Sequence, residues 1–188
     1  NAHGTERLVS AMEAEGGEGR LVYLSSMAAA GPAREGPVAP TDEPRPLTAY
    51  GRSKLAGEAA VLGSTLDAAV IRAPAVYGPG DRDLLTFFRI ARWGILPVVG
   101  PADRQVQLIH VTDLAAALAA AADAPGAVGV YHAAEPRPYT WDEVLAMVAD
   151  AVDRSGVKVQ IPGAVVKAAA AISEGASRLT RRPVIFDR

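Results

Sequence analysis

Short apolar runs that alternate with helical patterns constrain this chain more than any other feature. Residues 21–24 and 69–71 are apolar without polar alternation, which is typical of strands buried on both faces of a parallel sheet. Further strands are predicted at residues 106–111 and 130–132. Apolar residues recur at helical spacing between them, in residues 5–14, 48–62, 81–93, 113–122 and 141–152. The alternation of the two patterns predicts an α/β protein with a largely parallel sheet.

Capping residues mark where several of these helices begin. Thr48 is a predicted N-cap, and Thr140 with Glu143 has the spacing of a capping box. Asp113 is expected to cap the helix that starts with it. These residues fix the N-terminal ends of three predicted helices.

Glycine and proline indicate close approaches and loops. Gly51 and Gly57 lie inside a predicted helix, where each costs about 1 kcal/mol relative to alanine. We therefore expect another segment to approach that helix closely. Residues 31–47 are rich in proline and form a long loop, and residues 73–80 form a second loop. An alanine-rich amphipathic stretch is predicted after residue 162.

Composition excludes several classes of function. The chain has no cysteine, which excludes disulfides and thiolate catalysis and suits a reducing, cytoplasmic location. Its formal net charge of -2 gives no electrostatic reason to expect nucleic acid or an anionic membrane as partner. No apolar run is long enough to predict a membrane span. The lack of cysteine also excludes cysteine metal sites, and we predict no metal site.

Tyr50 and Lys54 lie four residues apart in a predicted helix, so their side chains share one face. No other lysine of the chain follows a tyrosine at this spacing. A tyrosine can move a proton to or from a carbinol oxygen, but a free tyrosine has a pKa near 10. A nearby lysine ammonium in a dry cleft favours the phenolate. The pair alone also fits an exposed tyrosine beside a solvated lysine.

Five segments around this pair follow one another in a recognisable order: residues 1–5, residues 21–26 with Gly31, residues 50–58, residues 72–80 and residues 109–114. Together they resemble the extended short-chain dehydrogenase/reductase family, the NAD-dependent epimerase/dehydratase group. Order and spacing agree over about residues 1–150. The resemblance implies a Rossmann-type doubly wound parallel sheet and NAD or NADP as cofactor.

The resemblance also implies a catalytic centre of Ser26, Tyr50 and Lys54. Tyr50 would be the general acid/base, and Lys54 would bind the nicotinamide ribose and favour the tyrosine phenolate. Ser26 would hydrogen-bond the reacting oxygen. The spacing to Gly31 favours Ser26 over Ser25, and we interpret Ser25 as a strand-end capping residue.

Further cofactor contacts are implied at two places. In the family, the backbone that follows the strand matching residues 69–71 contacts the nicotinamide amide. This points to Pro74, Ala75 and Val76. Asn1 matches an asparagine near the cofactor. An ordinary proline-initiated loop is the alternative interpretation of residues 74–76.

Three polar residues are candidates for contact with substrate. Arg82 and Arg104 could meet an anionic group, although surface arginines are common. His110 ends a predicted strand near the expected substrate. A buried, hydrogen-bonded structural histidine is the alternative interpretation of His110.

Departures from the family pattern narrow the chemistry. Met27 and Ala28 stand where sugar-nucleotide dehydratases carry Asp-Glu, which argues against that elimination. Ala30 replaces an aromatic residue, and Val106 replaces a diphosphate-binding arginine, of many epimerases. All three changes remove polar groups or bulk. The resulting pattern resembles the hydroxysteroid dehydrogenase and dihydroflavonol reductase branch, whose implied substrates are apolar alcohols or ketones.

The glycine-rich dinucleotide fingerprint and the residue that selects NAD or NADP are missing from the sequence. The chain starts inside a predicted helix and ends just after an apolar run at residues 184–186. We therefore expect an N-terminally truncated fragment that binds cofactor weakly by itself. Residues 1–135 would be the C-terminal part of the dinucleotide-binding domain, with 79–105 contributing to the substrate cleft. Residues 136–188 would be a partial substrate-binding portion.

We predict an NAD(P)-dependent oxidoreductase that acts on a hydroxyl or ketone of a lipophilic or polyketide-like small molecule. An NAD-dependent sugar-nucleotide epimerase is the first alternative, and a non-catalytic dinucleotide-sensing protein is the second. The family's subunits pair through helices that match residues 5–14 and 48–62, which implies a homodimer.

Overall fold

The structure is a computed structural model that describes residues 2–17, 19–33, 36–101, 103–124 and 126–162. Asn1 and the amphipathic stretch predicted after residue 162 lie outside these residues. The chain divides into two compact units, Asn1–Val76 with Ile109–Glu135 and Tyr77–Leu108 with Pro136–Arg188. The predicted assignment of residues 1–135 and 136–188 to cofactor and substrate stays a prediction.

A three-stranded parallel sheet forms the centre of the first unit. Its order is β1 (Arg20–Ser26), β2 (Asp67–Ala73) and β7 (Gly129–His132). The predicted α/β fold with a parallel, Rossmann-like sheet is confirmed for this unit. Because all three strands run in one direction, their carboxyl ends meet at one edge, where ligands bind in such sheets.

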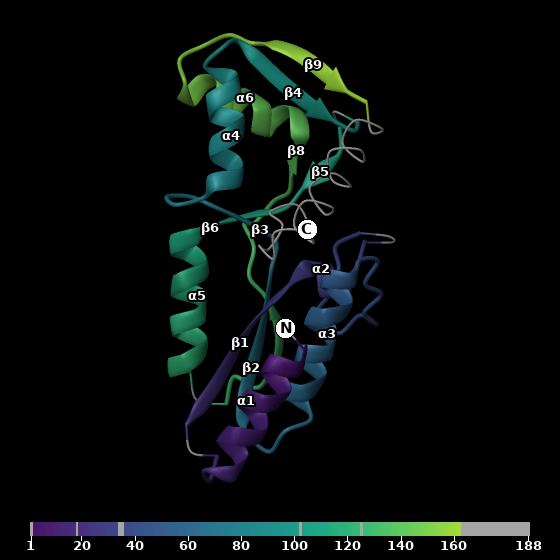
Figure 1. The fold of residues 1–188 in the computed structure, drawn as a ribbon, viewed down its shortest axis with the longest axis vertical. Coiled ribbons are helices and arrows are strands. Elements are labelled where there is room, and N and C mark those ends of the chain that lie inside the picture. Colours follow the sequence, from purple (N-terminus) through teal and green to yellow (C-terminus); the bar gives the residue numbers. More distant parts are fainter. Residues whose placement is uncertain (1, 18, 34–35, 102, 125, 163–188) are drawn as a thin grey trace, which may run out of the picture. The chain divides into compact units, whose positions relative to one another are not determined.

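Helices cover both faces of this sheet (Figure 1). Alternate residues of β2 point to opposite faces. Ala69 and Ile71 pack in a cluster with Leu114 of α5 (Val111–Asp123). Ala68 and Val70 pack on the other face in a cluster that includes residues of α1 (Ala2–Ala14) and α3 (Ala49–Leu62). The helix that carries Tyr50 and Lys54 therefore packs against the sheet through an apolar core.

The two apolar strand predictions have different outcomes. β2 is buried from Ala68 to Ala73, as predicted. β1 is not buried on both faces, because only Ser25 is buried and Leu24 is 40% exposed. The physical reason is position, since β1 is at the edge of the sheet among the described strands and β2 is in the centre.

Two of the three predicted caps are confirmed. Thr48 Oγ1 accepts a bond from Gly51 N at 2.9 Å and caps α3. Thr140 and Glu143 form the predicted capping box of α6 (Trp141–Ala151). The third prediction is wrong, because α5 begins at Val111 and its N-cap is His110. Asp113 instead lies in the first turn, where a carboxylate still stabilises the positive end of the helix.

The second unit packs α4 (Arg82–Ala91) and α6 beside short strands. These strands are the parallel pair β4 (Ile95–Val99) and β9 (Val157–Ile161), and the antiparallel pair β5 (Gln105–Val106) and β8 (Tyr139–Thr140). Phe87 and Trp141 meet edge to face, with ring centroids 5.5 Å apart. A small apolar core of its own therefore holds this unit together.

Some local predictions differ from the structure. Residues 106–111 are not one strand, because β5 ends at Val106 and β6 (Leu108–His110) follows. The loop after β2 contains the short strand β3 (Ala75–Tyr77), and the short helix α2 (Met27–Ala30) follows β1. Among the described residues, no helix has the length and apolarity that crossing a membrane needs.

Candidate active site

Tyr50 and Lys54 lie one helical turn apart, because α3 begins at Ala49 behind the cap of Thr48. Lys54 Nζ is 5.9 Å from the centroid of the Tyr50 ring. The same ammonium donates a hydrogen bond to the carbonyl oxygen of Leu24 at 2.9 Å. The lysine therefore links the helix to the C-terminal end of β1, at the ligand-binding edge of the sheet.

A second tyrosine also lies beside this lysine. The centroid of the Tyr23 ring is 5.3 Å from Lys54 Nζ. Burial raises the pKa of Tyr23, the hydroxyl of Thr5 acts in the opposite sense, and the charges of Glu58 and Tyr50 raise it further. A tyrosine with a raised pKa is a poor partner for proton transfer near neutral pH. Tyr50 is therefore the better candidate of the two.

The two serines at the end of β1 have different environments. Ser25 is 4% exposed and its hydroxyl donates to the carboxylate of Glu58. Ser26 is partly exposed, and its Oγ accepts a bond from Ala28 N at 3.2 Å as the N-cap of α2. The capping role expected of Ser25 thus belongs to Ser26. Accepting that bond leaves the hydroxyl proton of Ser26 able to donate to a substrate oxygen.

Two glycines allow the approach that the sequence predicted. A Cβ built at Gly51 would lie 2.2 Å from the carbonyl oxygen of Ala28, and one at Gly57 would lie 2.3 Å from the hydroxyl of Tyr23. The residue after Tyr50 therefore contacts the chain two residues beyond Ser26. This contact brings the segment that follows Ser26 against the first turn of α3, which carries Tyr50.

The segment predicted to contact nicotinamide begins beside Ser26. Ser26 pairs in register with Ala73, and Pro74, Ala75 and Val76 follow directly. Ala75 and Val76 are exposed. The first unit thus places Ser26, Tyr50, Lys54 and this segment on elements that meet at the carboxyl edge of one sheet.

The remaining predicted residues belong to other elements. Arg82 begins α4 of the second unit and is exposed, and Arg104 belongs to the same unit. His110 is hydrogen-bonded through Nδ1 to Thr112 Oγ1 at 2.7 Å, but it is only partly buried. The interpretation of His110 as a buried histidine is therefore wrong, because its ring caps α5 near the surface.

A buried ion pair was missed by sequence reasoning. Glu58 is 1% exposed and Arg72 is 2% exposed. Arg72 Nη2 lies 2.7 Å and Nε lies 3.0 Å from the two carboxylate oxygens of Glu58. The signal was present, since Glu58 continues the four-residue spacing of Tyr50 and Lys54 along a face that is buried there.

His132 lies next to this ion pair, because it is in register with Arg72 across the sheet. Burial lowers the pKa of His132, and the positive charge of Arg72 acts in the same direction. A backbone hydrogen bond to Val38 and the charges of Glu58 and Asp42 oppose this shift. His132 is therefore favoured in its neutral form in the folded chain.

The lowered pKa of His132 makes folding stability depend on pH. The unfolded chain binds more protons below about 6.5, so stability is complete above that pH and falls as the pH drops toward the folded-state value. When the pH is lowered from 7.5 to about 5.5, we expect the melting temperature of His132→Gln to fall less than that of the parent. Equal losses in both proteins, measured by circular dichroism, would contradict this assignment.

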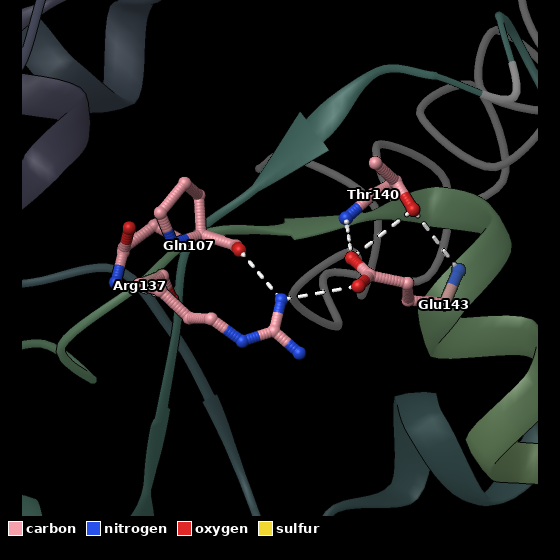
Figure 2. Close-up of polar contacts among 5 residues, drawn as sticks. Gln107, Arg137, Thr140 and Glu143 are labelled. Carbon is pink, nitrogen blue, oxygen red and sulfur yellow. Dashed lines mark hydrogen bonds and ion pairs between the residues drawn. The ribbon is translucent and has the colours of Figure 1, made fainter.

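A polar cluster of the second unit lies before α6 (Figure 2). The guanidinium of Arg137 is 4.3 Å from the ring centroid of Tyr139, and its Nη1 is 3.1 Å from Glu143 Oε1. A hydrogen bond from the backbone of Thr140 is the main cause that lowers the pKa of Glu143. Gln107 Nε2 donates to the carbonyl of Arg137 at 3.4 Å. These contacts fix the entry into α6.

Comparison with known proteins places the chain in a family. The model of the RmlD substrate binding domain matches residues 1–183. A ceramide reductase of Caulobacter vibrioides is 33% identical over 99% of this chain and 54% of its own length. A dTDP-4-dehydrorhamnose reductase of Mycobacterium tuberculosis is 40% identical over 71% of this chain and 45% of its own length. The chain therefore spans about half the length of these relatives.

Solved structures agree in fold. The protein MoeE5, in complex with UDP-glucuronic acid and NAD, is 27% identical with a TM-score of 0.74 over 86% of this chain and 57% of its own. A dTDP-4-dehydrorhamnose reductase from Clostridium acetobutylicum is 24% identical with a TM-score of 0.74 over 86% of this chain and 56% of its own. Because the family match covers almost all of its residues, the chain belongs to the RmlD substrate binding domain family, within the extended short-chain dehydrogenase/reductases.

Proposed function

We propose that this chain carries the proton-transfer centre of an NAD(P)-dependent reductase that converts a ketone to an alcohol. The observation that carries the proposal is the position of Lys54. Its ammonium lies between the Tyr50 ring and the Leu24 carbonyl, next to the strand end that bears Ser26. This arrangement pairs a candidate acid with a fixed positive charge at the ligand-binding edge of a parallel sheet.

The residues present fit the nicotinamide end of the cofactor. Lys54 offers an ammonium for ribose hydroxyls, and the exposed residues Ala75 and Val76 follow the strand end beside Ser26. Solved relatives are complexed with NADPH or with NAD, which supports the same cofactors here. When bound, the nicotinamide supplies the hydride. The sequence contains no G-x-G-x-x-G fingerprint for the pyrophosphate.

The three side chains divide the remaining chemistry. Ser26 donates a hydrogen bond to the substrate carbonyl oxygen and orients it. Tyr50 gives its phenolic proton to that oxygen as the carbonyl carbon is reduced, so that a ketone becomes a secondary alcohol and Tyr50 becomes a phenolate. Lys54 stabilises this phenolate by its positive charge. In the reverse direction Tyr50 acts as the general base.

A lipophilic ketone is the substrate class that we propose. The ceramide reductase aligns over almost the whole chain, and its name gives a lipid substrate. The apolar residues Met27, Ala28, Ala30 and Val106 also favour a lipophilic substrate. The dTDP-4-dehydrorhamnose reductase supports a sugar nucleotide as the alternative substrate. A position nearer the hydroxysteroid dehydrogenase branch stays a prediction, since the family match is to RmlD.

A pair of ketones tests the substrate class in the intact protein. We expect kcat/KM for a ketone with a long acyl chain to exceed that for a dTDP-4-keto sugar by about tenfold or more, since each buried methylene favours binding. The oxidation of NADPH or NADH, followed by absorbance, measures both rates. The opposite preference would support the sugar-nucleotide alternative. Sugar interconversion without net cofactor oxidation would support the epimerase, and cofactor binding without turnover would support the sensor.

We further propose that the intact protein is a homodimer through α1 and α3. These helices pack together and leave Leu8 53% and Leu62 44% exposed, which supports an apolar contact with a second copy. Sedimentation at micromolar concentration is expected to give a dimer, and Leu8→Glu is expected to shift it to monomer. A parent that sediments as a monomer would refute the proposal.

A further inference from the structure

The buried pair of Glu58 and Arg72, with Ser25, connects α3, β1 and β2 of the proposed active site. Glu58 lies on α3, one turn after Lys54 and two turns after Tyr50. Ser25, which donates to Glu58, immediately precedes Ser26 on β1. Arg72 lies on β2, two residues before Pro74. One carboxylate therefore joins the helix and the two strand ends that present the proposed catalytic and cofactor-binding residues.

We propose that Glu58 and Arg72, with Ser25, are positioning residues that hold α3 in register with the ends of β1 and β2. This inference rests on the proposed function of Tyr50, Lys54 and Ser26. The carboxylate of Glu58 touches neither substrate nor cofactor in this scheme. Glu58 acts through Lys54 and Tyr50, which lie one and two turns before it on α3. It also acts through the ends of β1 and β2, which Ser25 and Arg72 connect to it.

Energetics argue that stability alone does not explain the pair. Both side chains are almost completely buried, and moving two charges out of water opposes folding unless the pairing compensates. Apolar residues of similar volume in such places are often as stabilising or more so. Ion pairs that are retained inside proteins have in some cases been shown to fix one arrangement of elements rather than to add stability. The location of this pair indicates which arrangement it fixes.

Geometry explains why an apolar contact could not replace this function. Apolar packing is non-directional, so it limits poorly how far a helix slides along or rotates against a sheet. Glu58 accepts two hydrogen bonds, at 3.0 Å and 2.7 Å, from two nitrogens of one guanidinium. Because both bonds are directional, together they oppose sliding as well as rotation of the helix. A displacement of about 1 Å between reacting groups can cost about 100-fold in rate. The pair restricts α3 at the scale on which proton transfer depends.

The double variant Glu58→Leu with Arg72→Met tests the proposal in the intact protein. It removes both charges and leaves neither one unpaired, so we expect a melting temperature within a few degrees of the parent or above it. We expect kcat to fall by about tenfold or more, because Tyr50 and Ser26 lose their relative register. The KM for cofactor and the pH at half-maximal rate should stay near the parent values. A parent-like kcat in a folded double variant overturns the proposal, as does a changed pH profile with an undiminished plateau.

Matched variants separate this inference from the proposed function. Asp142→Leu with Lys158→Met removes an exposed ion pair of the second unit, 2.6 Å between charged atoms, and should leave kcat unchanged. Tyr50→Phe is measured in the same assay. If it is inactive while the buried-pair variant has parental kcat, only the positioning role fails. If Tyr50→Phe keeps parental turnover, the proposed function fails and the positioning role falls with it.

Ser25→Ala decides the question if the double variant does not fold. It removes one hydroxyl and leaves the two nitrogens of Arg72 on Glu58. We expect kcat to fall about fivefold, which corresponds to the loss of one hydrogen bond, with only a small change in melting temperature. A parental kcat for this variant overturns the proposal.

Discussion

Replacing Tyr50 by phenylalanine is expected to lower the turnover of the intact protein by about 100-fold or more, with cofactor affinity almost unchanged. The substitution removes only the phenolic hydroxyl, which we propose as the proton donor to the substrate oxygen. Lys54 keeps its bond to the Leu24 carbonyl and its contact with an aromatic ring. Turnover is measured by NAD(P)H oxidation and cofactor binding by nicotinamide fluorescence.

Tyr23→Phe is the matched control for this prediction. Tyr23 also lies over Lys54, at 5.3 Å, but burial raises its pKa and its hydroxyl packs against Gly57. We expect its turnover to remain within about threefold of the parent, because the lost group takes no part in proton transfer. A large loss in Tyr23→Phe together with an active Tyr50→Phe would exchange the roles of the two tyrosines.

Local sequence signals identified the elements that carry the site. Thr48 ends the proline-rich loop with an N-cap, and the four-residue spacing of Tyr50 and Lys54 puts both on one face of the resulting helix. Both features depend on neighbours along the chain, so they are readable without a structure. The apolar residues of β2 predicted a buried strand for the same reason.

Interactions between distant segments were not readable in this way. The bond from Ser25 to Glu58 spans 33 positions, and the sequence offered only a serine at a strand end, which fits capping equally well. Arg72 follows four apolar residues of β2, Ala68 to Ile71, and its partner depends on how α3 packs on the sheet. The exposure of β1 depends on its place at the sheet edge, which no local pattern determines.

The glycines of α3 predicted that another segment approaches this helix, but not which one. The structure identifies Ala28 beside Gly51 and Tyr23 beside Gly57. Gly51→Ala is expected to destabilise the intact protein by about 1–3 kcal/mol or more, although alanine favours a helix over glycine by about 1 kcal/mol. The added Cβ would lie 2.2 Å from the carbonyl oxygen of Ala28, so a backbone segment has to move. That segment follows Ser26 directly, and turnover should fall as well.

Gly4→Ala provides the control, because it makes the same change in another helix. Gly4 lies in α1, and nothing would lie within 4 Å of a Cβ at this position. Relief of the glycine penalty alone should then raise stability by up to about 1 kcal/mol. Urea unfolding of both variants measures the contrast. If Gly51→Ala is stabilised as much as Gly4→Ala, α3 and the turn after Ser26 are not in close contact, and the proposed neighbourhood of Ser26 and Tyr50 is lost with it.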